Sequence, residues 1–183
     1  TDGSEQLGLP ATGGHAASFV DFDQDGWPDL VVVAGNGVRF FRNMGGTFVD
    51  VTNHVYGDDS EYKFEVSNTL LSDIDNDGDM DVAVTHLPYE RSRFALLENK
   101  TLSKGKALVL KLVGSHAQDV TSSRRFSSRD AVGARILATL GDQLVFREII
   151  GGGSYLSASD LRVVLGVGAV SYTNLTLPTS ELV

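Results

Sequence analysis

The stretch Asp21-Phe-Asp-Gln-Asp-Gly-Trp-Pro-Asp29 occurs a second time as Asp73-Ile-Asp-Asn-Asp-Gly-Asp-Met-Asp81. Both copies follow the pattern D-x-D-x-D-G-x-x-D, in which carboxylates at positions 1, 3, 5 and 9 surround a glycine at position 6. A closed loop with this spacing can surround one hard cation with oxygen ligands. The sequence therefore predicts two cation sites, which we call loop 1 (residues 21–29) and loop 2 (residues 73–81).

The charge of the chain is concentrated in these two loops. Together they hold nine acidic residues and no Lys or Arg, and the formal net charge of the 183 residues is also −9, so the rest of the chain is neutral. Unit charges about 4 Å apart interact by several kcal/mol at an effective dielectric near 20, so such crowding is repulsive unless a cation neutralises it. A pair of solvated Asp/Gly turns is the alternative. Because the full motif occurs twice, each time between similar flanking segments, metal sites are favoured over solvated turns.

The residue types indicate which metal. Every candidate side-chain ligand is an oxygen donor, the chain has no cysteine, and neither loop contains His, which favours calcium over zinc or a soft metal. Magnesium prefers fewer carboxylates and keeps several waters. At position 7 we expect a backbone carbonyl ligand, with the Asp79 side chain directed toward solvent. The predicted ligands of the two calcium ions are Asp21, Asp23, Asp25, Trp27 and Asp29 in loop 1, and Asp73, Asp75, Asp77, Asp79 and Asp81 in loop 2.

The residues after each loop argue against an EF-hand. An EF-hand needs a bidentate Glu at position 12 that opens a helix, whereas position 12 is Val32 in loop 1 and Val84 in loop 2. The runs 30–34 and 82–85 are short, apolar and rich in Val, which is typical of buried strands. Each loop therefore connects two strands.

The loops lie within longer repeats. The first repeat predicts strands at 17–21, 30–34, 38–43 and 47–52, and the second at 68–72, 82–85 and 93–99. A Gly-Asn-Gly turn at 35–37 in the first repeat, and a longer turn through Pro88 in the second, separate the second and third strands. Both third strands end in an asparagine, Asn43 or Asn99. Four short strands in about 50 residues are one blade of a β-propeller.

The motif followed by an apolar strand resembles the FG-GAP or VCBS repeat over about residues 14–99. The resemblance implies blades of an integrin-type propeller with calcium in the blade loops. A closed propeller has about four to eight blades, and two are present. We therefore expect the chain to be the C-terminal part of a longer protein, whose remaining blades would contact it.

The second part of the chain has a different pattern. Strands are expected at 106–113, 131–140, 143–150 and 161–168, with a Gly141-Asp142 hairpin between the second and third. The segments Arg129-Asp-Ala-Val-Gly-Ala-Arg135, Gly151-Gly-Gly-Ser-Tyr-Leu-Ser157 and Leu165-Gly-Val-Gly168 resemble the ASPIC/UnbV domain. In the cartilage acidic protein family this domain follows a repeat propeller. Here the loop 115–128 is longer than that pattern.

The tail, residues 171–183, lacks the Trp-Pro-Ser-Gly strand end of the ASPIC/UnbV domain. It is either a divergent edge strand or foreign sequence at the end of the chain, and we favour foreign sequence. The predicted fold class is all-β, a partial β-propeller of two blades followed by a small β-rich ASPIC/UnbV domain. The expected boundaries are 1–56 and 57–105 for the blades, 106–170 for the ASPIC/UnbV-like domain and 171–183 for the atypical tail.

Other functional classes find little support in the sequence. The four histidines are scattered, and neither an H-E-x-x-H motif nor a G-x-S-x-G elbow occurs, so we expect no catalysis. An acidic chain lacks the basic stripe that nucleic acid requires. No apolar run reaches the roughly 18 residues of a membrane helix.

Two functions of different class remain. The first is a non-catalytic, calcium-binding extracellular module for adhesion or for interaction with a protein or carbohydrate. The second is the accessory C-terminal region of a secreted enzyme, and further repeats or a catalytic domain upstream would distinguish the two. Calcium at millimolar levels outside cells and the family resemblance favour secretion or cell-surface display, periplasmic or on the outer surface in a bacterium.

Overall fold

The computed structural model describes residues 3–9, 13–35, 37–56, 66–86, 93–101, 105–114, 128–141, 143–152, 158, 160–168 and 173–176. Nearly all regular structure in these residues is β-strand, and the strands form four antiparallel sheets. This confirms the predicted all-β fold class. Within the described residues, no helix is long and apolar enough to cross a membrane.

The first blade is a four-stranded sheet whose strands follow the order of the chain. They are β1 (Gly14–Val20), β2 (Asp29–Ala34), β3 (Gly37–Asn43) and β4 (Phe48–Asp50). The 3-10 turn η1 (Glu5–Leu7) precedes the sheet, and the helix α1 (Thr52–Tyr56) follows it. All six residues of β2 are buried, because neighbouring strands flank it and both faces of the sheet are covered.

The second blade contains three described strands, which correspond to the first three strands of the first blade. These are β5 (Val66–Ser72), β6 (Asp81–His86) and β7 (Arg93–Leu97). One hydrophobic core joins the blades, with Val31, Val33 and Phe40 from the first blade packed against Val82 and Val84 from the second. Each blade therefore buries one face of its sheet against the other blade.

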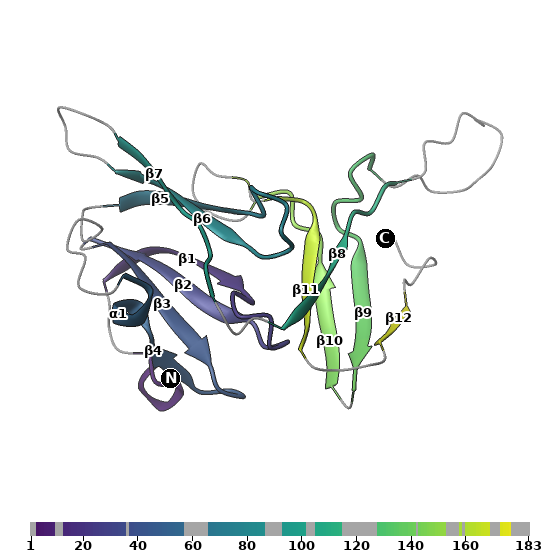
Figure 1. Cartoon of the computed structure of the whole chain (residues 1–183), viewed down its shortest axis with the longest axis horizontal. Coiled ribbons are helices and arrows are strands. Elements are labelled where there is room, and N and C mark those ends of the chain that lie inside the picture. Colours follow the sequence, from purple (N-terminus) through teal and green to yellow (C-terminus); the bar gives the residue numbers. More distant parts are fainter. Residues whose placement is uncertain are drawn as a thin grey trace.

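The C-terminal domain consists of two further sheets. Their strands are β8 (Lys106–Leu110), β9 (Arg135–Leu140), β10 (Gln143–Glu148), β11 (Val163–Gly168) and β12 (Thr173–Thr176). One sheet has the order β10-β9-β12 and the other pairs β11 with β8. Ile136 and Ala138 from the first sheet and Leu165 from the second form a separate core. Figure 1 shows the blades on one side of the molecule and this domain on the other, with β8 and β11 nearest the blades.

The predicted strands are present, but most of them begin or end at other residues than predicted, and β8 ends three residues early, at Leu110. A local hydrogen bond explains two of these differences. The run 47–52 ends as a strand at Asp50, because Asp50 Oδ1 accepts the amide of Thr52 at 3.0 Å and turns the chain into α1. The run 131–140 becomes a strand only at Arg135. The first residues instead form a turn, in which Ala131 has a φ of 51° and its carbonyl accepts the amide of Ala134.

The hairpin predicted at Gly141-Asp142 is confirmed by the pairing of β9 with β10, in which Leu140 lies opposite Gln143. In the tail, β12 pairs with β9. Several predicted segments lie outside the described residues: residue 36 of the first glycine turn, residues 87–92 around Pro88, residues 115–127 of the long loop, residues 153–157 of the glycine-rich segment, and residues 171–172 and 177–183 of the tail.

Candidate metal centre

Both acidic loops connect the first two strands of a blade, β1 to β2 and β5 to β6. Each loop bends through consecutive turns in which a carboxylate accepts the amide two residues ahead. In loop 1, Asp23 Oδ1 accepts the amide of Asp25 at 3.3 Å, and Asp25 Oδ1 accepts the amide of Trp27 at 2.9 Å. Loop 2 repeats both bonds, at 3.2 and 3.1 Å. Because Asp favours this turn, the repeated pattern fixes the same backbone path twice.

Glycine at position 6 is required by that path. Gly26 has a φ of 96° and Gly78 a φ of 94°, a region that residues with a Cβ rarely adopt. In loop 1 the amide of Gly26 donates to Asp21 Oδ2 at 3.0 Å, which directs one oxygen of the first aspartate toward the backbone. The turn therefore orients the first carboxylate of the motif.

The aspartate at position 9 holds the blade strands together. Asp29 Oδ2 accepts the amide of Phe22 at 3.0 Å, and its Oδ1 accepts the amide of Asn43 on β3 at 2.8 Å. Asp81 makes the same two bonds at 2.9 Å each, to the amide of Ile74 and to the amide of Asn99 just after β7. Both side chains are essentially buried. Position 9 therefore links the loop to the third strand of its blade.

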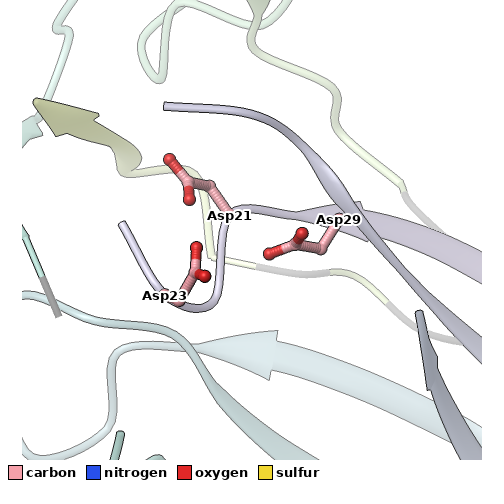
Figure 2. A group of neighbouring side chains, drawn as sticks. All are labelled: Asp21, Asp23 and Asp29. Atoms are coloured by element: carbon pink, nitrogen blue, oxygen red, sulfur yellow. The ribbon is translucent and has the colours of Figure 1, made fainter. Parts of the chain in front are cut away.

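The two loops bring different sets of carboxylates together. In loop 1, one oxygen from each of Asp21, Asp23 and Asp29 lies within 4.8 Å of the others. Figure 2 shows these three carboxylates grouped at the loop. In loop 2 the corresponding group is Asp73, Asp75 and Asp77. Each group holds three negatively charged oxygen donors in the space of a single ion.

The first aspartate of each loop has one oxygen without a hydrogen-bond partner in the part of the chain that the structure describes. Asp21 is 5% exposed and Asp73 is 3% exposed, yet Oδ1 of each makes no hydrogen bond to the described residues. Leaving a buried acceptor unsatisfied is costly, more so when it carries charge. A cation at each group would bind this oxygen.

Burial disfavours the charged state of the three grouped carboxylates of loop 1. It raises the pKa of Asp21 to about 6, and the charge of Asp25 adds to that rise. Burial also raises the pKa of Asp29 to about 7, although its two amide partners oppose the change, and it raises the pKa of Asp23. A positive charge at this position stabilises the ionised form and therefore opposes these shifts.

The remaining predicted ligands lie at the edges of these groups. Asp25 lies outside the loop 1 group, where its Oδ2 accepts a hydrogen bond from Arg42 Nη2 at 3.2 Å. The Trp27 side chain is exposed. Asp81 lies outside the loop 2 group, held by its two amides. The expectation that the Asp79 side chain points to solvent is wrong, since the residue is only 1% exposed.

Comparison with known families covers both halves of the chain. A family model described as FG-GAP-like repeat matches residues 21–84, which include both loops. A second family model, described as ASPIC and UnbV, matches residues 124–176. The chain carries an FG-GAP-like repeat followed by an ASPIC and UnbV domain. A comparison with curated proteins gives no match.

The donor set of the FG-GAP-like repeat fits calcium. All the grouped donors are carboxylate oxygens, which hard cations prefer, and the motif provides several of the six to eight oxygens that calcium takes. The orphaned Oδ1 atoms of Asp21 and Asp73 provide an independent reason for a cation at each loop. When bound, the ion would neutralise the carboxylates of its group, and in loop 1, where Asp21 and Asp29 both belong to the group, it would also join the two ends of the loop.

An asparagine at or just after the end of the third strand stabilises the loop region of each blade. The sequence indicated these two residues only through their equivalent positions in the repeats. Asn43 Oδ1 accepts the amides of Gly45 and Gly46, and its Nδ2 donates to the carbonyl of Pro28 at 2.9 Å. Asn99 Oδ1 accepts from Thr101, and its Nδ2 donates across the blades to the carbonyl of Phe22 at 2.7 Å. The shared Asn after the third strand was the available signal.

Two further residues of the FG-GAP-like repeat contact the acidic loops, and no pattern in the sequence indicated this role. Gln24 Nε2 donates to the carbonyl of Gly78 at 2.9 Å, which joins loop 1 directly to loop 2. Arg42 Nε lies 2.6 Å from Asp23 Oδ2 and provides a positive charge beside loop 1. Both contacts depend on how the blades fold, because their partners are distant in sequence.

Proposed function

We propose that this chain is a non-catalytic, calcium-binding extracellular repeat module that serves adhesion or interaction with a protein or carbohydrate. Loops 1 and 2 each bind one calcium ion, and the ions make the blade loops rigid. The FG-GAP-like match supports this proposal, since such repeats are typical of extracellular proteins. The lack of H-E-x-x-H and G-x-S-x-G motifs supports a role without catalysis.

The observation that carries the calcium proposal is the pair of orphaned oxygens. Asp21 and Asp73 occupy equivalent positions, both are buried, and each has an oxygen without a hydrogen bond among the described residues. Each is grouped with two more aspartates. A buried anionic oxygen in such a group gains most from a bound cation, because the cation replaces lost hydration and opposes the repulsion between carboxylates.

The effect of the ion on the fold follows from the connections of each loop. Loop 1 begins after β1 and ends at β2, and Asp29 continues the connection to Asn43 at the end of β3. A cation held by this loop therefore restrains three strands. A ligand that binds only the folded state stabilises it by about 2.7 kcal/mol when its concentration is a hundredfold above Kd. The bound ions would maintain the shape of the surface presented to a partner.

Calorimetric titration of calcium into chelator-treated protein tests this proposal. We expect two binding events for the unmodified chain, one after Asp21→Ala or Asp73→Ala, and none after both substitutions. Asp130→Ala provides a matched control, because Asp130 is an exposed aspartate outside the loops, and it should keep both events. Absence of binding near millimolar calcium, or binding unaffected by the loop substitutions, contradicts the proposal.

A further inference from the structure

An arginine from the C-terminal domain enters loop 2. Arg162 Nη2 donates to the backbone carbonyl of Asp73 at 2.6 Å, and Nη1 donates to Asn76 Oδ1 at 2.8 Å. Nη1 also lies 3.5 Å from Asp73 Oδ2, the oxygen beside the orphaned Oδ1. One guanidinium therefore contacts the main chain and the side chain of the first aspartate of the motif.

Asp160 holds this arginine in place and balances its charge. Arg162 Nε donates to Asp160 Oδ2 at 2.7 Å, and Nη2 lies 2.6 Å from the same oxygen. Asp160 is itself attached to the second blade, because its amide donates to the carbonyl of Leu71 at 3.1 Å and Ser72 Oγ donates to its carboxylate. With its charge offset, the guanidinium acts on loop 2 mainly through directed hydrogen bonds rather than as a competing cation.

Loop 1 obtains its arginine differently. Arg42, the residue before Asn43, belongs to the same blade as loop 1 and pairs with Asp23 and Asp25. The residue before Asn99 in the second blade is Glu98, which cannot take that role. The second blade therefore lacks an arginine at this position, and Arg162 from the following domain provides the guanidinium at loop 2.

We propose that Arg162 is a positioning residue for the second cation site, and that it couples docking of the ASPIC and UnbV domain to cation binding at loop 2. The guanidinium orients Asp73 and holds Asn76, so that the orphaned Oδ1 of Asp73 is preorganised for the ion. This inference rests on the proposed calcium function. Groups that orient a metal ligand typically change metal affinity by about 10–100-fold when removed.

The coupling acts in both directions. If the docked domain raises the affinity of loop 2 for the ion, the ion must strengthen docking by the same factor. The amide of Asp160 reports docking directly, because it bonds to Leu71 across the interface. Calcium should therefore slow hydrogen exchange at Asp160. This readout does not depend on any activity of the protein.

Calorimetry of Arg162 variants of the full chain tests the proposal. We expect Arg162→Ala to weaken calcium binding at loop 2 about tenfold and to leave loop 1 unchanged. Arg162→Ala combined with Asp73→Ala leaves loop 1 as the remaining site, and its calcium affinity should equal that of Asp73→Ala alone. Arg135→Ala is the matched control, since Arg135 is an exposed arginine of the same domain that pairs with Glu148.

Arg162→Lys separates charge from geometry. Lysine keeps the charge but lacks the planar fork that reaches all three acceptors, so we expect its loop 2 affinity to stay near that of the alanine variant. Arg162→Gln, which keeps one amide donor, replaces the alanine variant if that protein does not fold. In each variant calcium should lose most of its effect on exchange at Asp160.

The outcomes distinguish the two proposals. Absence of calcium binding by the unmodified chain overturns both. Two-site binding that Arg162→Ala leaves unchanged or tightens at loop 2 overturns the coupling alone, as does complete rescue by lysine. Equal exchange at Asp160 with and without calcium in the unmodified chain also overturns it.

Discussion

Loops 1 and 2 share one nine-residue motif but occupy different surroundings. The four hydrogen bonds from backbone amides to the aspartates at positions 3, 5 and 9 are the same in both loops. In loop 1 the three grouped carboxylates are all buried, whereas in loop 2 Asp75 and Asp77 are exposed. Arg42, which pairs with loop 1, comes from the same blade, and Arg147 of the C-terminal domain also interacts electrostatically with Asp21. The arginine that hydrogen-bonds to loop 2 comes from the C-terminal domain. A motif therefore sets local geometry, while its neighbours set burial and charge.

Removal of the position 9 aspartate should have the largest effect and should be similar in the two blades. Asp29→Ala and Asp81→Ala each leave two backbone amides without their carboxylate acceptor, which costs about 2–5 kcal/mol of unfolding free energy. Urea denaturation in chelator measures the loss. Asp130→Ala, at an exposed position outside the loops, is the control and should change little. A large difference between the two main variants would contradict the shared role.

The pH dependence of stability should reflect the burial of loop 1. The folded-state pKa values of Asp21 and Asp29, about 6 and about 7, exceed the ordinary value of 3.8. Their contribution to stability is therefore fully present below about pH 4 and is lost as pH rises toward 7. For the cation-free protein we expect a decrease of the order of a few kcal/mol over that range.

Thermal denaturation in chelator between pH 4 and 8 measures this decrease. Asp21→Asn should reduce the slope, because it removes one of the titrating groups, whereas Asp130→Asn at an exposed position should not. Saturating calcium should also reduce the slope, since it stabilises the ionised carboxylates. A slope that Asp21→Asn leaves unchanged would exclude loop 1 as its source.

The asparagine after the third strand should contribute less than the position 9 aspartate. Asn43→Ala removes the acceptor of two glycine amides and the donor to Pro28, all within the first blade. Asn99→Ala removes a hydrogen bond between the blades, to Phe22. We expect a loss of about 1–2 kcal/mol in each. Asn99→Ala alone should speed hydrogen exchange of amides on both blades, because it removes a contact between them. Hydrogen exchange measures this effect. The same exchange pattern in Asn43→Ala and Asn99→Ala would contradict the distinction between the two residues.

Arg42→Ala should have the smallest effect on stability. Its side chain is 40% exposed, and ion pairs of that kind contribute about 0–1 kcal/mol. Urea denaturation at low and high salt measures the contribution, which salt should reduce further. A loss well above 1 kcal/mol that persists at high salt would show that Arg42 also has a packing role. Lys100→Ala, which removes an exposed pair with Glu98, is the control.

Local features were the part of the fold that could be predicted. The Asp and Gly positions of the motif specify consecutive turns and a positive φ, and the Val-rich runs specify buried strands. The ends of elements were less predictable. The helix α1 follows a turn at Asp50, and the turn at Ala131 shortens β9, because in each case a local hydrogen bond interrupts a run of strand-forming residues.

The sequence by itself determined the two acidic loops, their oxygen donors, the strands that flank them and the order of the domains, because these depend on residue types at short spacings. Only the tertiary structure decided the burial of Asp79, the link from Gln24 to Gly78 and the approach of Arg162 to Asp73. Gly166 illustrates the reason: a Cβ there would lie 2.2 Å from Asp21 Oδ2, a restriction between residues distant in sequence. Such contacts arise from packing, which local pattern does not encode.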